Sequence, residues 1–174
     1  MRKRPSLKFE FSYEDTPTRR CLTLEPDGVP CLPVIGLDNF KKAVPDSSLH
    51  VHAECLEISL CLRGDLEFEL DGQVYPFRPD SIFVSRPSDA HRMMHYPRNM
   101  RKYWLMFRIP KGDFPLLGLL PAEAKWLRRE MLALPRSFTD VNHRVRTAFQ
   151  RVFQVYDSAP RGTPQRRFLV RNAV

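Results

Sequence analysis

The middle of the chain carries the period-two alternation of apolar and polar residues that is typical of half-buried β-strands. Four segments are predicted strands: 58–63, 66–70, 82–84 and 103–109. After the second of these, Asp71 and Gly72 supply the two positive-φ positions of a type I′ turn, so we expect the chain to return through Tyr75 as a hairpin. Many short strands separated by turn signals are typical of an all-β barrel or jelly roll.

From Pro110 onwards the period changes to that of α-helices. A first helix is predicted just after Pro121, a residue suited to a helix start. Its apolar stripe consists of Trp126, Leu127, Met131 and Leu134. Thr139 or Asp140 can cap a second helix, and Phe168-Leu169-Val170 resembles the opening turns of a third. The fold class is therefore mainly β, followed by C-terminal α-helices.

The second predicted helix, from about residue 140 to 156, carries a continuous apolar stripe. The stripe consists of Val141, Val145, Phe149, Val152 and Tyr156. It is longer than one short neighbouring helix needs to cover, and an exposed stripe of this length usually marks a partner surface. We therefore predict that these residues form the interface of a homodimer.

The length of 174 residues allows one domain with a substantial core. Apolar residues make up 43% of the chain, as in globular proteins, and 16 prolines against 7 glycines fit short strands that end in rigid turns. We expect three segments: an N-terminal arm with edge strands at 1–48, a barrel core at 49–110, and a helical dimerisation or linker segment at 111–174.

Basic residues outnumber acidic ones by 28 to 20, which gives a net charge of +8. A solvated basic surface explains this charge as well as a nucleic-acid-binding face does. The basic N-terminus lacks the apolar segment of a secretion signal, and no segment approaches the roughly 20 apolar residues of a membrane span. The four cysteines show no CxxC spacing. We therefore expect reduced thiols in a cytoplasmic protein with no membrane partner.

Three histidines and one glutamate form the most informative group of the sequence. His50 and His52 are two residues apart, so they share a face if their segment is extended. Glu57 lies an odd number of residues further on, so a turn or bulge within 53–56 must intervene before it can join them. His91 follows one hairpin later. We predict that at least three of the four side chains face one interior cavity.

Two interpretations of this group stay open. Three imidazoles and one carboxylate suffice for a divalent metal such as Fe, Mn, Ni or Zn, with positions left for water or substrate. Such a metal could polarise a bound oxygen or activate dioxygen. The same residues could instead line a metal-free pocket, with the histidines hydrogen-bonded to the backbone or to a ligand. We favour the second interpretation and expect no cofactor.

The spacing of His50, His52 and Glu57 resembles the first signature of cupin barrels, and the segment Pro87–His91 corresponds to the second. The resemblance to the sensor domains of AraC-type transcription regulators is more specific, because it extends from about residue 45 to 174. Its further matching positions are Gly64, Asp71-Gly72, Pro79, His91-Arg92, Tyr103-Trp104, Phe138, Phe149 and Phe153. The resemblance implies a cupin-like double-stranded β-barrel, or jelly roll, followed by dimerisation helices.

The chain departs from the AraC-type pattern in two places. Asp80-Ser81 stands where the family usually has Gly-Asp, although Asp tolerates the left-handed conformation better than most residues. The helix-turn-helix DNA reader of the family is missing, so we expect a truncated product, an isolated sensor domain or a stand-alone relative. DNA would be contacted only through that further region, and we expect no sequence-specific DNA binding by this polypeptide.

The resemblance implies a ligand-sensing and dimerisation domain of an AraC-type regulator, not an enzyme. We expect a small polar molecule, and first of all a sugar, to bind inside the barrel. The candidate ligand-binding residues are His50, His52, Glu57 and His91, with aromatic walls from Phe68, Phe83 and Tyr103. The first four are also the candidate metal ligands. The alternative is a metal-dependent cupin enzyme, an oxygenase, isomerase or epimerase, that acts on a small polar substrate.

Overall fold

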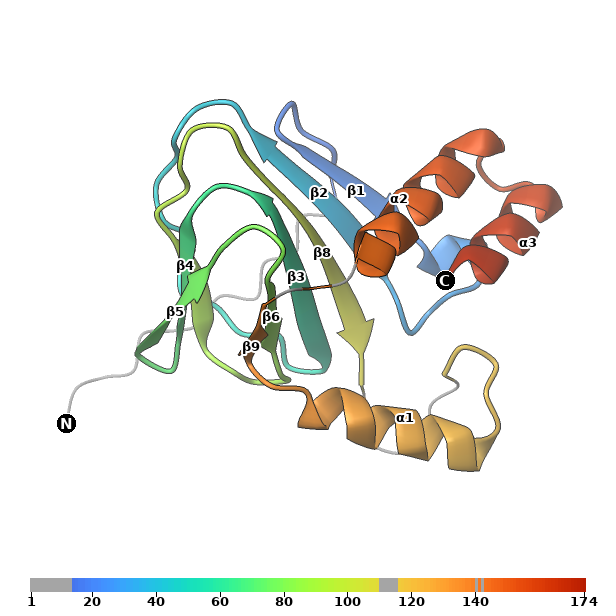
Figure 1. The fold of residues 1–174 in the computed structure, drawn as a ribbon. Helices are drawn as coiled ribbons and strands as arrows, with labels where there is room; N and C mark the ends of the chain where they lie inside the picture. The colour runs from blue at the N-terminus through green and yellow to red at the C-terminus, as the bar shows by residue number, and fades with distance from the viewer. Residues whose placement is uncertain (1–13, 110–115, 140, 142) are drawn as a thin grey trace.

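The computed structural model describes residues 14–109, 116–139, 141 and 143–174, and its strands form two antiparallel sheets (Figure 1). The larger sheet contains, in spatial order, β1 (Arg19–Thr23), β2 (Val34–Phe40), β8 (Met100–Arg108), β3 (Cys55–Arg63), β6 (Ile82–Ser85) and β9 (Ser137–Phe138). The smaller sheet contains β5 (Gln73–Phe77), β4 (Leu66–Leu70) and β7 (His91–Met94).

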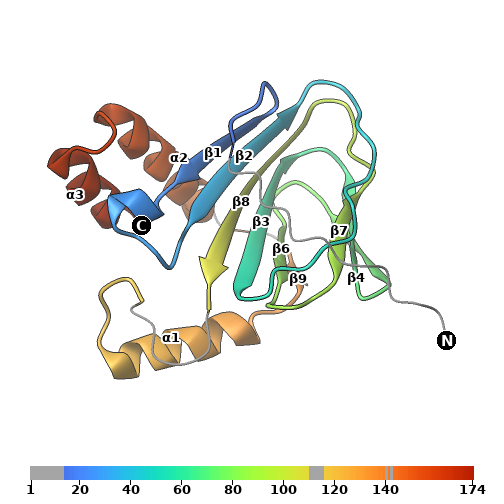
Figure 2. The same cartoon turned by 180° about the vertical axis from the view of Figure 1, so that it is seen from behind.

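The two sheets pack face to face and enclose the interior. Seen from behind, β1, β2, β8 and β3 run side by side, with β4 and β7 opposite them (Figure 2). Phe68 of β4 stacks on Phe83 of β6 with ring centroids 4.0 Å apart, so the apolar contact spans both sheets. In the described part of the chain, no ladder of hydrogen bonds closes the sheets into one barrel. The predicted mainly β, cupin-like fold is confirmed.

The predicted hairpin at Asp71 and Gly72 is also confirmed. The φ angles of these two residues are 50° and 83°, both in the left-handed region that a type I′ turn requires. Leu70 and Gln73 pair directly across the turn as the last and first residues of β4 and β5.

The N-terminal segment contributes strands to the larger sheet. β1 forms its edge and β2 pairs with β8, with a short 3₁₀ helix, η1 (Glu25–Asp27), between them. Gly36 of β2 lies opposite Trp104 of β8. A Cβ atom at Gly36 would lie 2.0 Å from the Trp104 ring, so this pairing requires glycine at residue 36.

Three α-helices follow the strands: α1 (Pro121–Ala133), α2 (His143–Ser158) and α3 (Pro164–Ala173). The first begins at the predicted proline, but Trp126 is 56% exposed instead of packed in the predicted stripe. The third begins four residues before Phe168, because the Thr163 hydroxyl accepts the hydrogen bond of the Arg166 N–H. Pro110 and the proposed cap Asp140 lie outside the described residues. No described helix is both long and apolar enough to cross a membrane.

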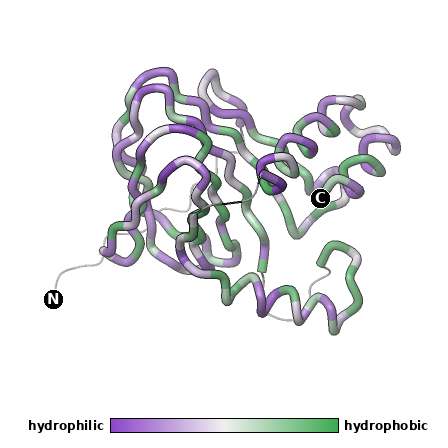
Figure 3. The backbone as a smooth tube through the Cα atoms, in the orientation of Figure 1, coloured by the Kyte–Doolittle hydropathy of each residue, from purple (hydrophilic) through white to green (hydrophobic). Residues whose placement is uncertain are grey.

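Apolar and polar residues alternate along the strands and helices (Figure 3). The apolar face of α2 packs on the outer face of the larger sheet. We call this outer face the helix side, and the face toward the smaller sheet the cavity side. On the helix side, Phe149 stacks on Tyr103 of β8 with centroids 4.8 Å apart.

This packing corrects the premise of the predicted dimer interface. Phe149, Val152 and Tyr156 are each only 5% exposed, because the chain's own sheet and α3 cover them. Val141 and Val145 are half-buried against the same core. The stripe packs on the sheet of its own chain, and the sequence pattern alone does not distinguish such packing from a partner surface.

A buried ion pair joins α3 to the rest of the helix side. The Arg166 Nε atom donates to an Asp27 carboxylate oxygen of η1 at 3.0 Å, and both side chains are about 5% exposed or less. The guanidinium carbon of Arg166 also lies 3.6 Å from the centroid of the Tyr156 ring. Arg166 is therefore held between a buried carboxylate and an aromatic ring.

Candidate functional site

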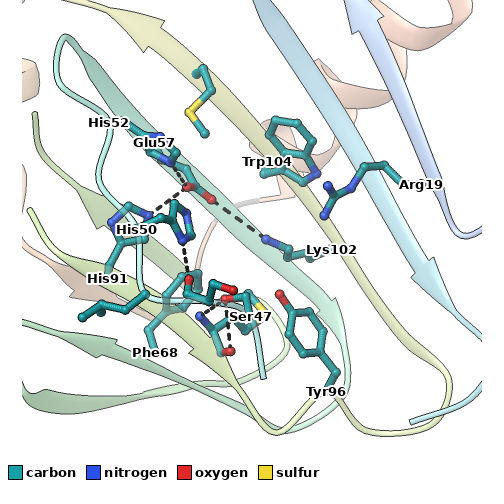
Figure 4. Close-up of a pocket in the computed structure, with 14 residues that line it drawn as sticks. Arg19, Ser47, His50, His52, Glu57, Phe68, His91, Tyr96, Lys102 and Trp104 are labelled. Atoms are coloured by element: carbon teal, nitrogen blue, oxygen red, sulfur yellow. Dashed lines mark hydrogen bonds and ion pairs between the residues drawn. The ribbon is translucent and has the colours of Figure 1, made fainter. Parts of the chain in front are cut away.

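A cavity of about 290 Å³ opens between the two sheets (Figure 4). This volume is near the lower end of the range for small-molecule sites. The residues that line it are Arg19, Ser47, Ser48, Leu49, His50, His52, Glu57, Phe68, His91, Met93, Tyr96, Lys102, Trp104 and Met106.

The predicted His/Glu group converges on one wall of this cavity. His50 forms an isolated bridge with His91, the chain bends at Ala53 and Glu54, and β3 then carries Glu57 inward. One nitrogen or oxygen atom from each of the four side chains lies within 4.8 Å of the corresponding atoms of the other three. The turn that the odd spacing required is therefore present where the sequence predicted it.

Glu57 is the centre of the group. Its Oε2 atom lies 3.2 Å from Nε2 of His52 and 3.2 Å from Nε2 of His91, and its Oε1 atom accepts the Ser59 hydroxyl hydrogen bond at 2.9 Å. Burial by itself would raise the pKa of Glu57. The hydrogen bonds from His52 and His91 and the charge of Lys102 outweigh burial and hold this pKa well below its usual range.

Backbone carbonyls orient two of the histidine rings. Nδ1 of His50 donates to the Ser48 carbonyl at 2.8 Å, and Nδ1 of His91 donates to the Asp89 carbonyl at 3.0 Å. His91 thus faces a carbonyl on one side and the Glu57 carboxylate on the other, which favours the doubly protonated ring. Burial opposes this charge, but the hydrogen bond and charge of Glu57 raise the pKa of His91. Burial, together with the charge of His91, lowers the pKa of His50.

The opposite wall is formed by aromatic and basic side chains. Trp104 donates from Nε1 to Asp38 at 3.2 Å, and Arg19 holds the same carboxylate with two contacts, at 2.8 and 3.3 Å. Asp38 itself is fully buried. Lys102 extends from β8 into the space between the walls, and the Tyr96 hydroxyl points into the same space (Figure 4). Burial raises the pKa of Tyr96, so its hydroxyl remains a donor.

The aromatic residues predicted to line the site lie in three different places. Phe68 lines the cavity. Phe83 is stacked behind Phe68 and is not among the lining residues. Tyr103 lies on the helix side, where it stacks on Phe149, so it is not an aromatic wall of this cavity.

Residues of the opposite wall were not predicted. Neighbouring residues of β8 alternate between the two sides, so that Lys102, Trp104 and Met106 face the cavity and Tyr103 and Phe107 face the helix side. The alternation along the strand separates these two sets of residues. It does not tell which set faces the cavity, because both faces of the sheet are covered by other parts of the chain. Lys102 and Trp104 could have indicated which set faces the cavity, because a buried lysine and a buried indole need hydrogen-bond partners, which a polar cavity provides.

The cluster fits a divalent metal by its donor types and closely by its dimensions. Two ligand atoms at about 2.1 Å from one ion lie at most about 4.2 Å apart. The four donor atoms lie within 4.8 Å of one another, so the side chains would have to move closer together to hold one ion. The carbonyl contacts engage Nδ1 of His50 and of His91, so Nε2 would be the ligating atom of each ring, and Nε2 of His91 would first have to lose the proton that it shares with Glu57.

Comparison with known families identifies the domain. The description "AraC-like ligand binding domain" matches residues 45–166, which is most of the chain. The chain belongs to the AraC-like ligand-binding domain family. The matched range covers β3 to β8 and extends into α3, so it contains the His/Glu group and the cavity-facing part of β8. As an AraC-like domain, the chain is of a type that binds a small molecule.

Similar solved structures include cupin proteins of low sequence identity. KdgF from Halomonas sp. is 18% identical with a TM-score of 0.45, and the match covers 60% of this chain and 96% of that one. A Cupin 2 conserved barrel domain protein from Salinispora arenicola is 20% identical with a TM-score of 0.42, over 62% and 88% of the two chains. A predicted oxalate decarboxylase from Thermotoga maritima is 14% identical with a TM-score of 0.44, over 52% and 81%. A search of curated proteins found no match.

Proposed function

We propose that this domain senses a small polar molecule, with a sugar as the first candidate, and that it does so as part of a cytoplasmic AraC-type transcription regulator. The observation that carries the proposal is the polar cavity between the sheets of an AraC-like ligand-binding domain. DNA binding is assigned to a further region and not to this domain. The domain is a sensor and not an enzyme in this proposal.

The two walls of the cavity offer complementary contacts to such a molecule. Glu57 can accept hydrogen bonds from hydroxyl groups, and His50 and His52 offer ring nitrogens beside it. Trp104 on the other wall offers an aromatic face for the apolar side of a sugar ring. A few convergent polar groups opposite an aromatic surface are typical of small-molecule sites.

Strand β8 gives the sensor a physical connection to its helices. Trp104 faces the cavity, and its neighbour Tyr103 stacks on Phe149 of α2. A ligand that moves β8 would therefore also move the surface on which α2 packs. The prediction that two copies of the domain associate is retained as part of the proposal, and sedimentation equilibrium tests it against the 20.4 kDa mass of one chain.

Calorimetric titration with a panel of sugars and other small polar molecules tests the proposed function. We expect saturable binding of at least one compound, with about tenfold weaker affinity in Glu57→Gln, since a hydrogen bond to a charged group is lost. Glu130→Gln on the exposed face of α1 is the matched control and should bind like the wild type. The absence of saturable binding across the panel would contradict the proposal.

A metal-dependent cupin enzyme is the second candidate, and the convergence of the four donor side chains favours it. A divalent ion held by His50, His52, Glu57 and His91 would supply Lewis acidity to a bound oxygen. Mass spectrometric metal analysis of the purified protein tests this candidate. Stoichiometric metal that is lost in His91→Ala and kept in His143→Ala, an exposed histidine of α2, would support it. Metal far below one equivalent would contradict it.

A further inference from the structure

Lys102 is a buried cation in the cavity that is not part of the His/Glu group. It follows Arg101 on β8 and lies in a row of paired residues on the cavity side, in which Arg19 pairs with Asp38, and Asp38 pairs with Lys102. Its side chain is only 7% exposed, and its ammonium group ends inside the cavity (Figure 4). Burying a charge costs a great deal unless close partners compensate it.

The contacts of this ammonium group are all long. Its Nζ atom lies 3.4 Å from the Ser59 hydroxyl, 3.7 Å from Asp38 and 3.9 Å from Glu57. Charge-assisted hydrogen bonds are usually about 2.7–2.9 Å long. Among the residues that the structure describes, Lys102 makes no shorter hydrogen bond or ion pair, although an ammonium group has three hydrogens to donate.

Both nearby carboxylates are engaged by closer donors. Asp38 receives Arg19 at 2.8 Å and Trp104 at 3.2 Å, and Glu57 receives Ser59 at 2.9 Å. Neither carboxylate can therefore be regarded as the dedicated partner of Lys102. The ring of Phe68, 5.8 Å from Nζ, offers it a cation–π contact but no hydrogen-bond acceptor.

We propose that Lys102 binds a carboxylate group of the ligand, so that the domain selects small hydroxy acids or sugar acids over neutral sugars. This inference rests on the proposed function and assigns a ligand class to the same cavity. A ligand oxygen at the ordinary hydrogen-bond distance would give Lys102 the acceptor that the protein does not provide. The Tyr96 hydroxyl, which points into the same space, can donate to the second carboxylate oxygen (Figure 4).

The surroundings of Lys102 favour a carboxylate over a phosphate. The guanidinium fork of Arg19 is already held by Asp38 through two contacts, and the protonated ring of His91 is held by Glu57. The charge of Lys102 and the hydroxyl of Tyr96 together match a group with one negative charge and two oxygens. A phosphate, with a larger charge and more acceptor oxygens, is usually bound by further donors.

Fluorescence titration with matched pairs of compounds tests this inference. The pairs are glucuronate with glucose, galacturonate with galactose, and lactate and malate with their amides. Trp104 and Trp126 are the two tryptophans of the chain, so Trp126→Phe leaves the cavity residue as the only indole reporter. We expect at least one acid to bind about tenfold or more tightly than its neutral counterpart.

Lys102→Met tests the residue itself, because methionine keeps the length of the side chain and removes the charge. The acid should lose about tenfold or more in affinity, and a neutral compound that binds should change by less than about threefold. Lys125→Met, the same change at an exposed position of α1, is the control and should bind like its parent.

Two results would overturn the carboxylate assignment and leave the proposed function intact: a neutral compound that binds as tightly as its acid, or unchanged acid affinity in Lys102→Met. The absence of saturable binding for every compound would overturn both proposals. If circular dichroism shows that Lys102→Met does not fold, the comparison of acid with neutral compound in the Trp126→Phe protein decides the question without it.

Discussion

The two sides of the larger sheet treat buried charge differently. On the helix side, Asp27 and Arg166 form a close pair at 3.0 Å, and Arg166 also lies against the Tyr156 ring. On the cavity side, the shortest contact of Lys102 is 3.4 Å, and its nearest carboxylate oxygen is 3.7 Å away. Both sides bury charge, but Lys102 lacks the close carboxylate partner that Arg166 has.

This difference separates a structural role from a binding role. A charge pair that is complete inside the protein has no capacity left for a ligand, and its removal affects folding. A cation whose partners are distant contributes less to folding and can still accept a ligand. The comparison therefore predicts large effects on stability on the helix side, and small effects on stability with large effects on binding on the cavity side.

The largest effect is expected at Arg166. Arg166→Ala should lower the free energy of unfolding by about 3–5 kcal/mol, because it leaves the Asp27 carboxylate buried without its partner. Urea denaturation measures this change. The double variant Asp27→Leu/Arg166→Met should recover most of the loss, since it removes both charges together. A loss below about 1 kcal/mol in the single variant, as for a surface pair, would contradict the contrast between the two sides.

Gly36→Ala should have the next largest effect. The added Cβ would lie 2.0 Å from the Trp104 ring, so the indole must move, and such overpacking usually costs about 1–3 kcal/mol. Combining the change with Trp104→Leu, which removes the clashing ring, should cost less than the sum of the two single variants. Additive costs would show that the indole does not rest on Gly36. In Gly36→Ala alone, the fluorescence maximum of Trp104 should shift because the ring leaves its position.

Lys102→Met should change the free energy of unfolding by no more than about 1 kcal/mol, because Asp38 and Glu57 keep their closer donors and methionine fills much of the same space. The same urea experiment as for Arg166→Ala measures it. A loss of stability as large as that of Arg166→Ala would show that Lys102 also has a structural role, and it would contradict the difference proposed between the two sides of the sheet.

The smallest effect concerns the protonation of His91. Burial lowers its pKa, but Glu57 more than reverses this and leaves the pKa raised above the ordinary value of 6.5. The folded protein therefore binds this proton more tightly than the unfolded chain does. The resulting stabilisation is complete below pH 6.5 and is lost as the pH rises through the raised pKa of His91.

Glu57→Gln should lower the pKa of His91, because it removes the carboxylate that stabilises the charged ring. NMR titration of the histidine ring signals, in protein freed of metal with a chelator, measures this shift. The ring signals of His143, which is exposed on α2, provide a comparison within the same spectra. An unchanged pKa of His91 would show that Glu57 does not control its protonation.

The sequence predicted those parts of the fold and site that depend on local spacing. The period-two segments became strands, Asp71-Gly72 formed the expected turn, and the odd spacing between His52 and Glu57 required the bend that the structure contains. These outcomes follow from backbone geometry over a few residues. The convergence of the His/Glu group could be predicted for the same reason.

The wrong predictions concern which face of a strand or helix is buried, and against which part of the protein. Tyr103 and Trp104 are adjacent on β8, and the choice of which one faces the cavity depends on where α2 packs. The stripe that contains Phe149 looked like a partner surface because its true partner, the outer face of the sheet, is distant in sequence. Spacing along a strand or helix does not carry this information.

The most direct test of the central claim, that the cavity between the sheets is the ligand site, is a two-dimensional NMR titration that follows the two indole N–H signals. Trp104 lines the cavity and Trp126 is exposed on α1. With the best-binding compound of the panel, the Trp104 signal should shift along a saturable curve with the dissociation constant from calorimetry, and the Trp126 signal should stay in place. Saturable binding that leaves the Trp104 signal unmoved would place the ligand elsewhere and contradict the account.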